Sequence, residues 1–295
     1  ITDCEVIASV SGGKDSTALV LALREAGVPH RMVFADTAWE APETYAHLDV
    51  LRKHLGPIEV VGVKGGMEAR CRYRAGFPAR MQRWCTHELK LEPLRAYHER
   101  VIDQVGRDTV NAMGVRAQES KRRAEMVEWE WDERWDGYVW RPILAWAVED
   151  VLAIHHRHGV PLNPLYHAGF SRVGCWPCIY ASKEEIRLIA EHDPTRIDRI
   201  EAFEQEIEAD RARRNAETPG RYAHATAAFF MDRIGGGMKH IRDVVAWSRT
   251  TRGGKQLPLL AEPPQGGCMR WGLCEPPESE RLTAVSSYER EDDPR

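Results

Sequence analysis

A short stretch near the start of the chain combines two glycines, one lysine and three hydroxyl side chains. Its residues, in order, are Ser11, Gly12, Gly13, Lys14, Asp15, Ser16 and Thr17. An apolar run precedes it and a helix-forming run follows it, so its backbone N–H groups would stand at a helix N-terminus, where anions bind. Lys14 could neutralise phosphate charge, and the hydroxyls could donate to phosphate oxygens. We therefore expect a phosphate-binding loop, with a serine-capped glycine turn as the alternative.

This loop is not a Walker loop. Ala8 stands where that motif needs its first glycine, and Asp15 stands where it needs Ser or Thr.

Cysteines are a second source of chemistry. Cys175 and Cys178 form a C-x-x-C pair, and Cys268 and Cys274 form a looser one. Such spacing is typical of zinc sites and of iron-sulfur clusters, and it does not distinguish them. In a reducing compartment, clustered thiols indicate metal or redox chemistry rather than disulfides.

Charged residues that follow predicted strands could belong to the same site as the loop. Asp36 comes after the second predicted strand, where its carboxylate could hold Mg2+ or a ribose, or could simply cap a turn. Four cations follow the fourth predicted strand and could bind phosphate or sulfate; they are Arg116, Lys121, Arg122 and Arg123. A solvated surface cluster is the alternative.

Two further segments mix aromatic and charged residues. Before Cys85, five arginines alternate with aromatic rings and could grip a phosphodiester backbone, or could form a solvated loop; they are Arg70, Arg72, Arg74, Arg80 and Arg83. Further along, Trp129, Trp131 and Trp135 alternate with acids and predict a β-hairpin that packs its tryptophan face.

Strand and helix patterns alternate through the first half of the chain and place these residues. The predicted strands are Glu5–Val10, Arg31–Phe34, Ile58–Val63 and Thr109–Met113. The predicted helices are Ser16–Ala26, Glu43–Leu55, His87–Val105 and Val148–His158. Strand-helix-strand units form parallel sheets. We expect a doubly wound α/β fold with the phosphate loop and Asp36 at the carboxyl edge of the sheet.

The pattern changes after residue 160, where Gly159 and Pro161 end the last of these helices. We expect a nucleotide-binding α/β domain over residues 1–160 and a helical, cysteine-containing extension over residues 161–295. Long charged helices are predicted at Lys183–Asn215 and at about Ala223–Ile234.

Bulk composition limits the possible functions. A chain of 295 residues, 43% hydrophobic, can bury one α/β core and an appended domain. A net charge of -4 argues against a broad basic surface, so any contact with nucleic acid must be local. No apolar stretch approaches the roughly 18 residues of a membrane span, and we expect a cytoplasmic protein with no membrane partner.

In their order along the chain, these motifs resemble those of the PP-loop ATP pyrophosphatases and, among them, the phosphoadenosine phosphosulfate (PAPS) reductase family. The resemblance runs from about Val6 to Cys178. The segments that carry it are Ser11–Thr17, Asp36-Thr37, Cys85–Leu94, Gly114-Val115-Arg116, and Asn163-Pro164-Leu165-Tyr166 leading into Gly174-Cys175-Trp176-Pro177-Cys178. It implies an adenine nucleotide alpha hydrolase-like fold and an enzyme that splits ATP between its α and β phosphates.

The resemblance also implies which residues serve the reaction. Ser11 to Thr17, Asp36, Gly114 and Arg116 would surround ATP and Mg2+. The residues implied as catalytic are Lys14, Asp15, Arg116 and Cys85.

For the cysteines, the resemblance is to cluster-bearing adenylylsulfate reductases, which have a second cysteine where Thr86 stands. It implies a [4Fe-4S] cluster held by Cys85, Cys175, Cys178 and Cys274, with Cys268 as the alternative fourth ligand. A structural Zn2+ on the last four cysteines is the alternative to iron.

Two departures separate this chain from reductases that act on PAPS. Those usually have an altered phosphate loop and a C-terminal Glu-Cys-Gly, whereas here Lys14 and Asp15 are intact and the tail has Cys274-Glu275. The chain looks more similar to ATP-splitting sulfurtransferases, which include DNA phosphorothioation proteins of the DndC and SspD type.

That likeness implies adenylation of a DNA backbone phosphate, with release of AMP and pyrophosphate. It also implies sulfur delivery by a cysteine desulfurase, and it is compatible with a homodimer. The alternatives are PAPS or adenylylsulfate reduction, tRNA thiolation, and a non-catalytic nucleotide-sensing subunit.

Overall fold

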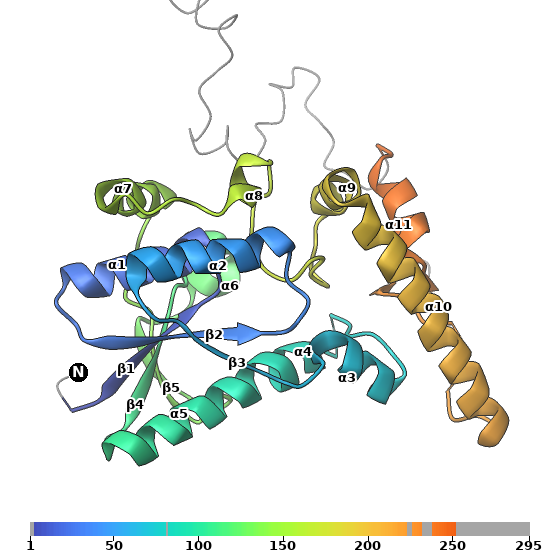
Figure 1. Cartoon of the computed structure of the whole chain (residues 1–295), viewed down its shortest axis with the longest axis horizontal. Helices are drawn as coiled ribbons and strands as arrows, with labels where there is room; N and C mark the ends of the chain where they lie inside the picture. Colours follow the sequence, from blue (N-terminus) through green and yellow to red (C-terminus); the bar gives the residue numbers. More distant parts are fainter. Residues whose placement is uncertain (1–2, 81, 223–225, 232–237, 252–295) are drawn as a thin grey trace, which may run out of the picture.

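A six-stranded sheet lies at the centre of the α/β part of the molecule (Figure 1). The computed structural model describes residues 3–80, 82–222, 226–231 and 238–251. The strands are β1 (Glu5–Val10), β2 (His30–Asp36), β3 (Glu59–Gly62), β4 (Thr109–Met113), β5 (Trp129–Asp132) and β6 (Gly137–Trp140). Their order is β3-β2-β1-β4-β6-β5, and neighbours are parallel except for β5 and β6. The predicted doubly wound α/β fold is confirmed.

The order in which the chain adds strands to the sheet changes direction between β1 and β4. From β1 it moves outward to β2 and β3, and it then returns to place β4 and β6 on the other side. The carboxyl ends of β1 and β4 therefore border the switch point, where doubly wound sheets bind ligands. The predicted phosphate loop follows β1, and Gly114 follows β4.

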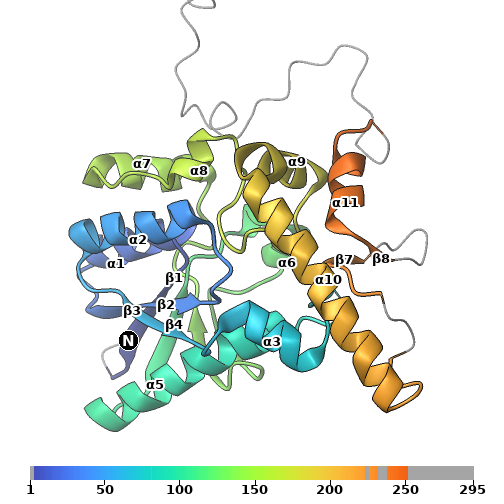
Figure 2. The ribbon, with the colours of Figure 1, turned by 45° about the vertical axis from the view of Figure 1, so that its right-hand side comes forward.

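Helices cover both faces of the sheet (Figures 1 and 2). Helices α1 (Lys14–Glu25), α2 (Pro42–Leu55) and α7 (Val148–His158) pack on one face, and α5 (Glu92–Val105) packs on the other. Alternation along β1 directs Val6 and Ala8 to the first face and Ile7 to the second, and all three are at most 2% exposed. Burial on both faces explains why β1 has three consecutive apolar residues, Val6, Ile7 and Ala8.

The helix predicted at His87–Val105 starts earlier and contains an irregular turn. Helix α4 (Trp84–Thr86) continues into a π-helical turn (His87–Leu91) and then into α5. Such π turns occur mostly as single insertions in α-helices and are frequent at functional sites. Cys85 lies just before this turn, and Lys90 lies within it.

Shorter helices connect the remaining elements. Helix α3 (Gly66–Arg74) follows β3, and a 3-10 turn (Ala117–Glu119) and α6 (Lys121–Ala124) follow β4. Helix α8 (Pro164–His167) lies between α7 and the C-x-x-C loop. The helices in the described ranges include none long and apolar enough to cross a membrane.

The C-terminal part is helical, but the single helix predicted at Lys183–Asn215 is wrong. Two helices lie there, α9 (Lys183–His192) and α10 (Pro194–Glu217). The side chain of Asp193 accepts the Arg196 N–H at 3.0 Å and so caps α10, whose first turn contains Pro194. Proline cannot continue α9 because it has no N–H to donate.

The helix predicted at about Ala223–Ile234 is also wrong where the structure describes this segment. Phe230–Met231 (β7) pairs with Met238–Lys239 (β8), and α11 (Ile241–Ser248) follows. The buried carboxylate of Glu204 on α10 accepts the N–H of Phe229 at 2.8 Å and that of Ile241 at 2.9 Å. These tertiary hydrogen bonds fix the segment in a non-helical path.

A hydrophobic cluster joins residues from the two halves of the chain. Trp39 and Leu89 pack in the same cluster as Phe203 and Phe229. The ring centroid of Trp39 lies 5.7 Å from that of Phe229 and 6.4 Å from that of Phe203. The division into residues 1–160 and 161–295 stays a prediction, and both of these parts contribute to this core.

The predicted hairpin exists as β5 and β6, but only one of its three predicted tryptophan rings is buried. Trp135 is 6% exposed, whereas Trp129 and Trp131 are 40% and 54% exposed and contact Tyr138 on the neighbouring strand. The prediction of a packed tryptophan face was therefore wrong for these two rings, because β5 is the edge strand of the sheet.

The buried ring of His98 predicts how stability depends on pH. Its Nδ1 lies 2.8 Å from the Thr109 hydroxyl, its ring packs 4.8 Å from Trp135, and burial lowers its pKa to about 3. Below pH 6.5 the unfolded chain binds a proton that the folded protein excludes, so this stability is complete above pH 6.5 and is lost toward pH 3. From pH 7 to pH 5 we expect His98 to account for a loss of about 2 kcal/mol, measured by urea unfolding.

The matched variant is His98→Gln, which keeps a polar group near Thr109 but does not titrate. Its unfolding free energy should vary less with pH than that of the wild type. Some dependence should remain, because burial also lowers the pKa of His47, to about 4. The same pH dependence in both proteins would contradict this role of His98.

Candidate functional site

Hydroxyl groups set the shape of the loop that follows β1. The Ser16 hydroxyl accepts the Ser11 N–H at 3.0 Å and donates to the Gly13 carbonyl at 3.0 Å. The Thr17 hydroxyl donates to the same carbonyl at 3.2 Å. Gly12 has a φ of 74°, in the left-handed region that favours glycine. The loop is therefore held in a fixed curve at the N-terminus of α1, as an anion site requires.

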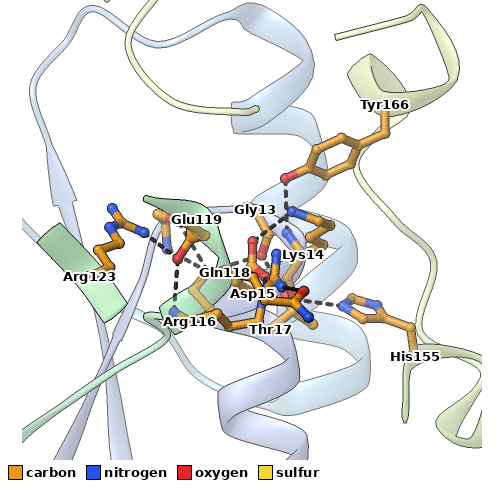
Figure 3. Close-up of polar contacts among 12 residues, drawn as sticks. Gly13, Lys14, Asp15, Thr17, Arg116, Gln118, Glu119, Arg123, His155 and Tyr166 are labelled. Atoms are coloured by element: carbon orange, nitrogen blue, oxygen red, sulfur yellow. Dashed lines mark hydrogen bonds and ion pairs between the residues drawn. The ribbon is translucent and has the colours of Figure 1, made fainter. Parts of the chain in front are cut away.

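Lys14, Asp15 and Arg116 form an ion network at the start of α1 (Figure 3). Lys14 Nζ lies 2.7 Å from one carboxylate oxygen of Asp15, and Arg116 Nε donates to the other. Burial by itself would raise the pKa of Asp15, but the charges and hydrogen bonds of Lys14 and Arg116 outweigh it and lower that pKa. One carboxylate thus faces two cations, which favours an additional anionic ligand.

Gly114 lies where β4 ends against the first turn of α1. A Cβ at this position would stand 2.6 Å from the carbonyl oxygen of Asp15 and 2.7 Å from the Cα of Ser16. Only glycine permits this approach without a backbone shift. Gly114 was predicted to contact nucleotide, and the structure places it where it lets Arg116 reach Asp15.

Three residues that the sequence did not single out for the site also contact the loop. The Tyr166 hydroxyl accepts the Lys14 N–H at 3.1 Å, and His155 Nε2 lies 2.9 Å from the Lys14 carbonyl oxygen (Figure 3). Asn163 donates to the Gly12 carbonyl at 3.2 Å. Asn163 and Tyr166 could have been found from the Asn-Pro-Leu-Tyr motif, but His155 gave no sequence signal.

Four cations follow β4, and among the described contacts Arg116 is the one of these four that binds Asp15. Arg123 instead pairs with Glu119, whose carboxylate also accepts the Arg116 N–H at 2.8 Å. Lys121 and Arg122 are exposed. The solvated-surface alternative therefore fits the two exposed residues.

Asp36 is the last residue of β2 and begins a second polar cluster. Its carboxylate accepts the Ala38 N–H at 2.8 Å and the Tyr45 hydroxyl at 2.8 Å. The Tyr45 hydroxyl also lies 3.1 Å from Glu40, whose other carboxylate oxygen accepts the Thr37 hydroxyl at 2.7 Å. Asp36 thus caps a turn at the carboxyl edge of the sheet, and its role toward Mg2+ or a ribose stays a prediction.

The C-x-x-C loop packs on the residues that follow β2. Glu40 and Cys175 form an antiparallel bridge, and the Trp176 N–H donates to the Trp39 carbonyl at 2.7 Å. The Trp39 indole N–H donates to the Pro177 carbonyl at 3.1 Å. These contacts fix the C-x-x-C loop at the carboxyl edge of the sheet.

Cys85, Cys175 and Cys178 lie near one another, with Lys90 beside them. Burial raises the pKa of the Cys85 thiol, and the neighbouring Cys175 and Cys178 raise it further. Burial also raises the pKa of Cys175, against the opposing effect of Lys90. Three of the four predicted metal ligands thus pack against one hydrophobic cluster, and a lysine that the sequence did not single out influences two of them.

The donor chemistry of this cluster suits a thiolate-bound metal, because sulfur ligands favour zinc and iron-sulfur clusters. In the described ranges, no three His, Cys, Asp or Glu side chains are arranged as ligands of one metal ion. Cys268 and Cys274, the alternative fourth ligands, lie outside the described residues.

A doubly wound sheet with a glycine-rich loop and a helix N-terminus at its switch point is the arrangement of nucleotide-binding α/β proteins. Residues 5–181 match the phosphoadenosine phosphosulfate reductase domain. The chain belongs to this family, as its motifs predicted.

The relatives include a phage protein and reductases that act on sulfated nucleotides. The chain is 34% identical to an uncharacterised 37.8 kDa protein of Escherichia phage 186, over 86% of this chain and 91% of that protein. It is 29% identical to an adenosine 5'-phosphosulfate reductase of Allochromatium vinosum, over 60% of this chain and 68% of that enzyme. A PAPS reductase structure from Candida auris, in a phosphate complex, is 19% identical with a TM-score of 0.46, over 58% of this chain and 81% of that chain. The likeness to DNA phosphorothioation proteins stays a prediction.

The close packing at Gly114 predicts the effect of adding one methyl group. Gly114→Ala should force the first turn of α1 away from β4, and we expect ATP to bind at least about 10-fold more weakly, because misplaced phosphate ligands lose their alignment. Isothermal titration calorimetry would measure this change.

Gly106→Ala is the matched control. Gly106 has a φ of 65°, and an added methyl there meets nothing within 4 Å, so this variant is strained but remote from the loop. It should lose stability and keep its affinity for ATP. Equal ATP affinities in the two variants would show that Gly114 does not position the site.

Proposed function

We propose that this protein is an ATP pyrophosphatase that adenylates an acceptor for sulfur transfer, with a DNA backbone phosphate as the acceptor. The main support is the network of Lys14, Asp15 and Arg116 at the phosphate loop. The cysteine loop lies against the same edge of the sheet. Membership of the PAPS reductase family supports nucleotide-dependent sulfur chemistry.

In this proposal the phosphate loop binds the β and γ phosphates of ATP. Lys14 neutralises their oxygens, and the helix N-terminus donates N–H groups to them. Arg116 stabilises the charge that develops as the bond between the α and β phosphates breaks. Asp36 would hold Mg2+ together with the phosphates, since a carboxylate and phosphate oxygens are its usual ligands.

Adenylation would make the acceptor phosphate reactive. An oxygen of the acceptor attacks the α-phosphorus of ATP, and pyrophosphate leaves with the electron pair of the broken bond. The terminal sulfur of a cysteine persulfide, formed by a cysteine desulfurase, then attacks the acceptor phosphorus, and AMP leaves with the acceptor oxygen. A second thiol attacks the inner sulfur of the persulfide, which breaks the S–S bond, forms a disulfide and releases the sulfur on phosphorus. The product is a phosphorothioate.

Cys85, Cys175, Cys178 and Cys274 would hold a [4Fe-4S] cluster, with Cys268 as the alternative to Cys274 and Zn2+ as the alternative to iron. When bound, this centre would supply a thiolate-coordinated metal able to interact with sulfur. Burial keeps the Cys85 and Cys175 thiols protonated, so metal binding must release their protons. Lys90 would offset the negative charge of the resulting thiolates.

Reduction of adenylylsulfate is a second candidate, favoured by the 29% identity with an adenosine 5'-phosphosulfate reductase. The two activities differ in the substrate that yields AMP. We would incubate the protein with ATP, DNA and a persulfide donor and, separately, with adenylylsulfate and a thiol reductant. AMP and sulfite from adenylylsulfate, with no AMP from ATP, would replace the first proposal by the second.

Removal of the Lys14 ammonium tests the role of the phosphate loop. Lys14→Ala should lower AMP release from ATP by at least about 100-fold, as expected when a preorganised cation at a developing charge is lost. The fold should persist because Asp15 keeps its contact with Arg116. Lys53→Ala, on the exposed surface of α2, is the control. AMP release at the wild-type rate from Lys14→Ala would refute the pyrophosphatase assignment.

Cys85→Ser should separate ATP splitting from sulfur transfer. The phosphate loop does not contain Cys85, so ATP splitting, seen as pyrophosphate release, should persist, whereas bound metal and phosphorothioate product should fall to background. We would measure melting temperature, iron and zinc content, pyrophosphate and thiolated DNA on anaerobically purified protein supplied with ATP and DNA, with Cys4→Ser as the control. A folded Cys85→Ser protein that forms product normally would refute a role for Cys85, and zinc without iron would favour the structural zinc alternative.

A further inference from the structure

The arginines that precede α4 fall into two groups according to their ion pairs. Arg70 and Arg74 both contact the carboxylate of Glu88, and Arg72 contacts that of Glu206 at 2.6 Å. The charges of these three arginines are therefore compensated within the protein. They fit the solvated-loop alternative rather than a surface that binds anions.

Arg80 and Arg83 differ from these three. Both are exposed, and in the part of the chain that the structure describes neither has a carboxylate partner. Their guanidinium carbons lie 5.5 Å and 5.2 Å from the ring centroid of Tyr180. The negative face of an aromatic ring attracts cations and can hold these two near each other despite their repulsion.

Hydrogen bonds fix this group beside the cysteines. Arg80 Nε donates at 3.2 Å to the backbone carbonyl of the residue that follows Cys178, and the Tyr180 hydroxyl donates to the Arg80 carbonyl at 3.3 Å. The Tyr180 N–H contacts the Cys178 sulfur at 3.5 Å. Arg83 lies two residues before Cys85. The two arginines thus connect both of the described cysteine segments.

We propose that Arg80, Arg83 and Tyr180 form a clasp for the phosphodiester backbone of a DNA strand. This inference rests on the proposed function and assigns the residues that hold the acceptor. Among the described residues, each guanidinium keeps N–H groups without a hydrogen-bond acceptor, which suit phosphate oxygens, and Tyr180, 40% exposed, orients them. Because the net charge of the chain is -4, the protein cannot rely on a general attraction to DNA and needs such a local contact.

The clasp lies beside the cysteines that are proposed to hold the metal centre. A strand held at Arg80 and Arg83 passes beside Cys85 and Cys178, and the C-x-x-C loop is bridged to Glu40 at the carboxyl edge of the sheet. The clasp therefore brings a backbone phosphate toward the edge at which ATP would bind.

The test is DNA binding over a series of NaCl concentrations, measured by fluorescence anisotropy with single-stranded DNA, duplex DNA and RNA of one sequence. Arg80→Gln/Arg83→Gln should weaken DNA binding by about 10-fold or more. It should also reduce the slope of log Kd against log salt by about 1.4 to 1.8, because each lost phosphate contact removes about 0.7 to 0.9 of a released cation.

The matched control is Arg213→Gln/Arg242→Gln, which changes the net charge equally. Both of these arginines are exposed, and each pairs with two carboxylates, Asp210 and Glu217 for Arg213, Asp198 and Glu201 for Arg242. This variant should bind DNA like the wild type.

Tyr180 is a positioning residue in this proposal, and its replacement should change the affinity for DNA without changing the salt dependence. Tyr180→Leu should weaken DNA binding while the salt slope stays unchanged, because both cations remain but are no longer oriented. Tyr180→Phe keeps the ring and should recover most of the affinity.

Equal DNA binding by the clasp variant and the control variant would overturn the clasp. Tighter binding of RNA than of either DNA would overturn the assignment to DNA. Failure of the proposed function would be seen separately, as an absence of AMP release from ATP by wild-type protein supplied with DNA and a persulfide donor, whatever the DNA-binding result.

Discussion

The contact between the C-x-x-C loop and the end of β2 is the interaction on which the rest of the structure depends. The bridge between Glu40 and Cys175 joins the carboxyl edge of the sheet to the helices that follow residue 160. Trp39 is 1% exposed, and its indole N–H donates to the Pro177 carbonyl in the C-x-x-C loop. The large ring is therefore buried with its N–H satisfied. Arg196 lies 3.8 Å above that ring and donates to the Trp176 carbonyl at 2.7 Å. The residues that unite the two parts of the chain are thus those that hold the C-x-x-C loop at the carboxyl edge of the sheet.

The two halves of the site handle charge in opposite ways. At the phosphate loop, Lys14 and Arg116 both contact the Asp15 carboxylate, which orients the two cations. In the proposed function an arriving phosphate would meet preformed cations at little cost in reorganisation. At the cysteine cluster, burial raises the pKa of Cys85 and holds the thiol neutral. The first half is therefore prepared for an anion, whereas the second would become charged only when a metal replaces its protons.

Much of the fold and part of the site followed from local patterns. The strand at Glu5–Val10 and the helix at Val148–His158 were predicted to the residue, because each has a strong periodicity and clear end signals. The predicted helix at about Ala223–Ile234 failed because hydrogen bonds to Glu204, distant in sequence, overrode local preference. His155 was missed for a related reason, since its contact with the loop exists only once α7 packs on α1.

The sequence by itself determined the glycine-rich loop after the first strand, the main strands and helices of the α/β part, and the identity of the residues able to do chemistry, because these depend on neighbours along the chain. Only the tertiary structure decided which of those residues act together. It paired Asp15 with Arg116 across 101 positions of sequence. It also separated the compensated Arg72 from Arg80, although the two lie on the same segment and look alike in sequence. Ion pairing and burial depend on distances through space, and residue spacing along a chain does not fix those distances.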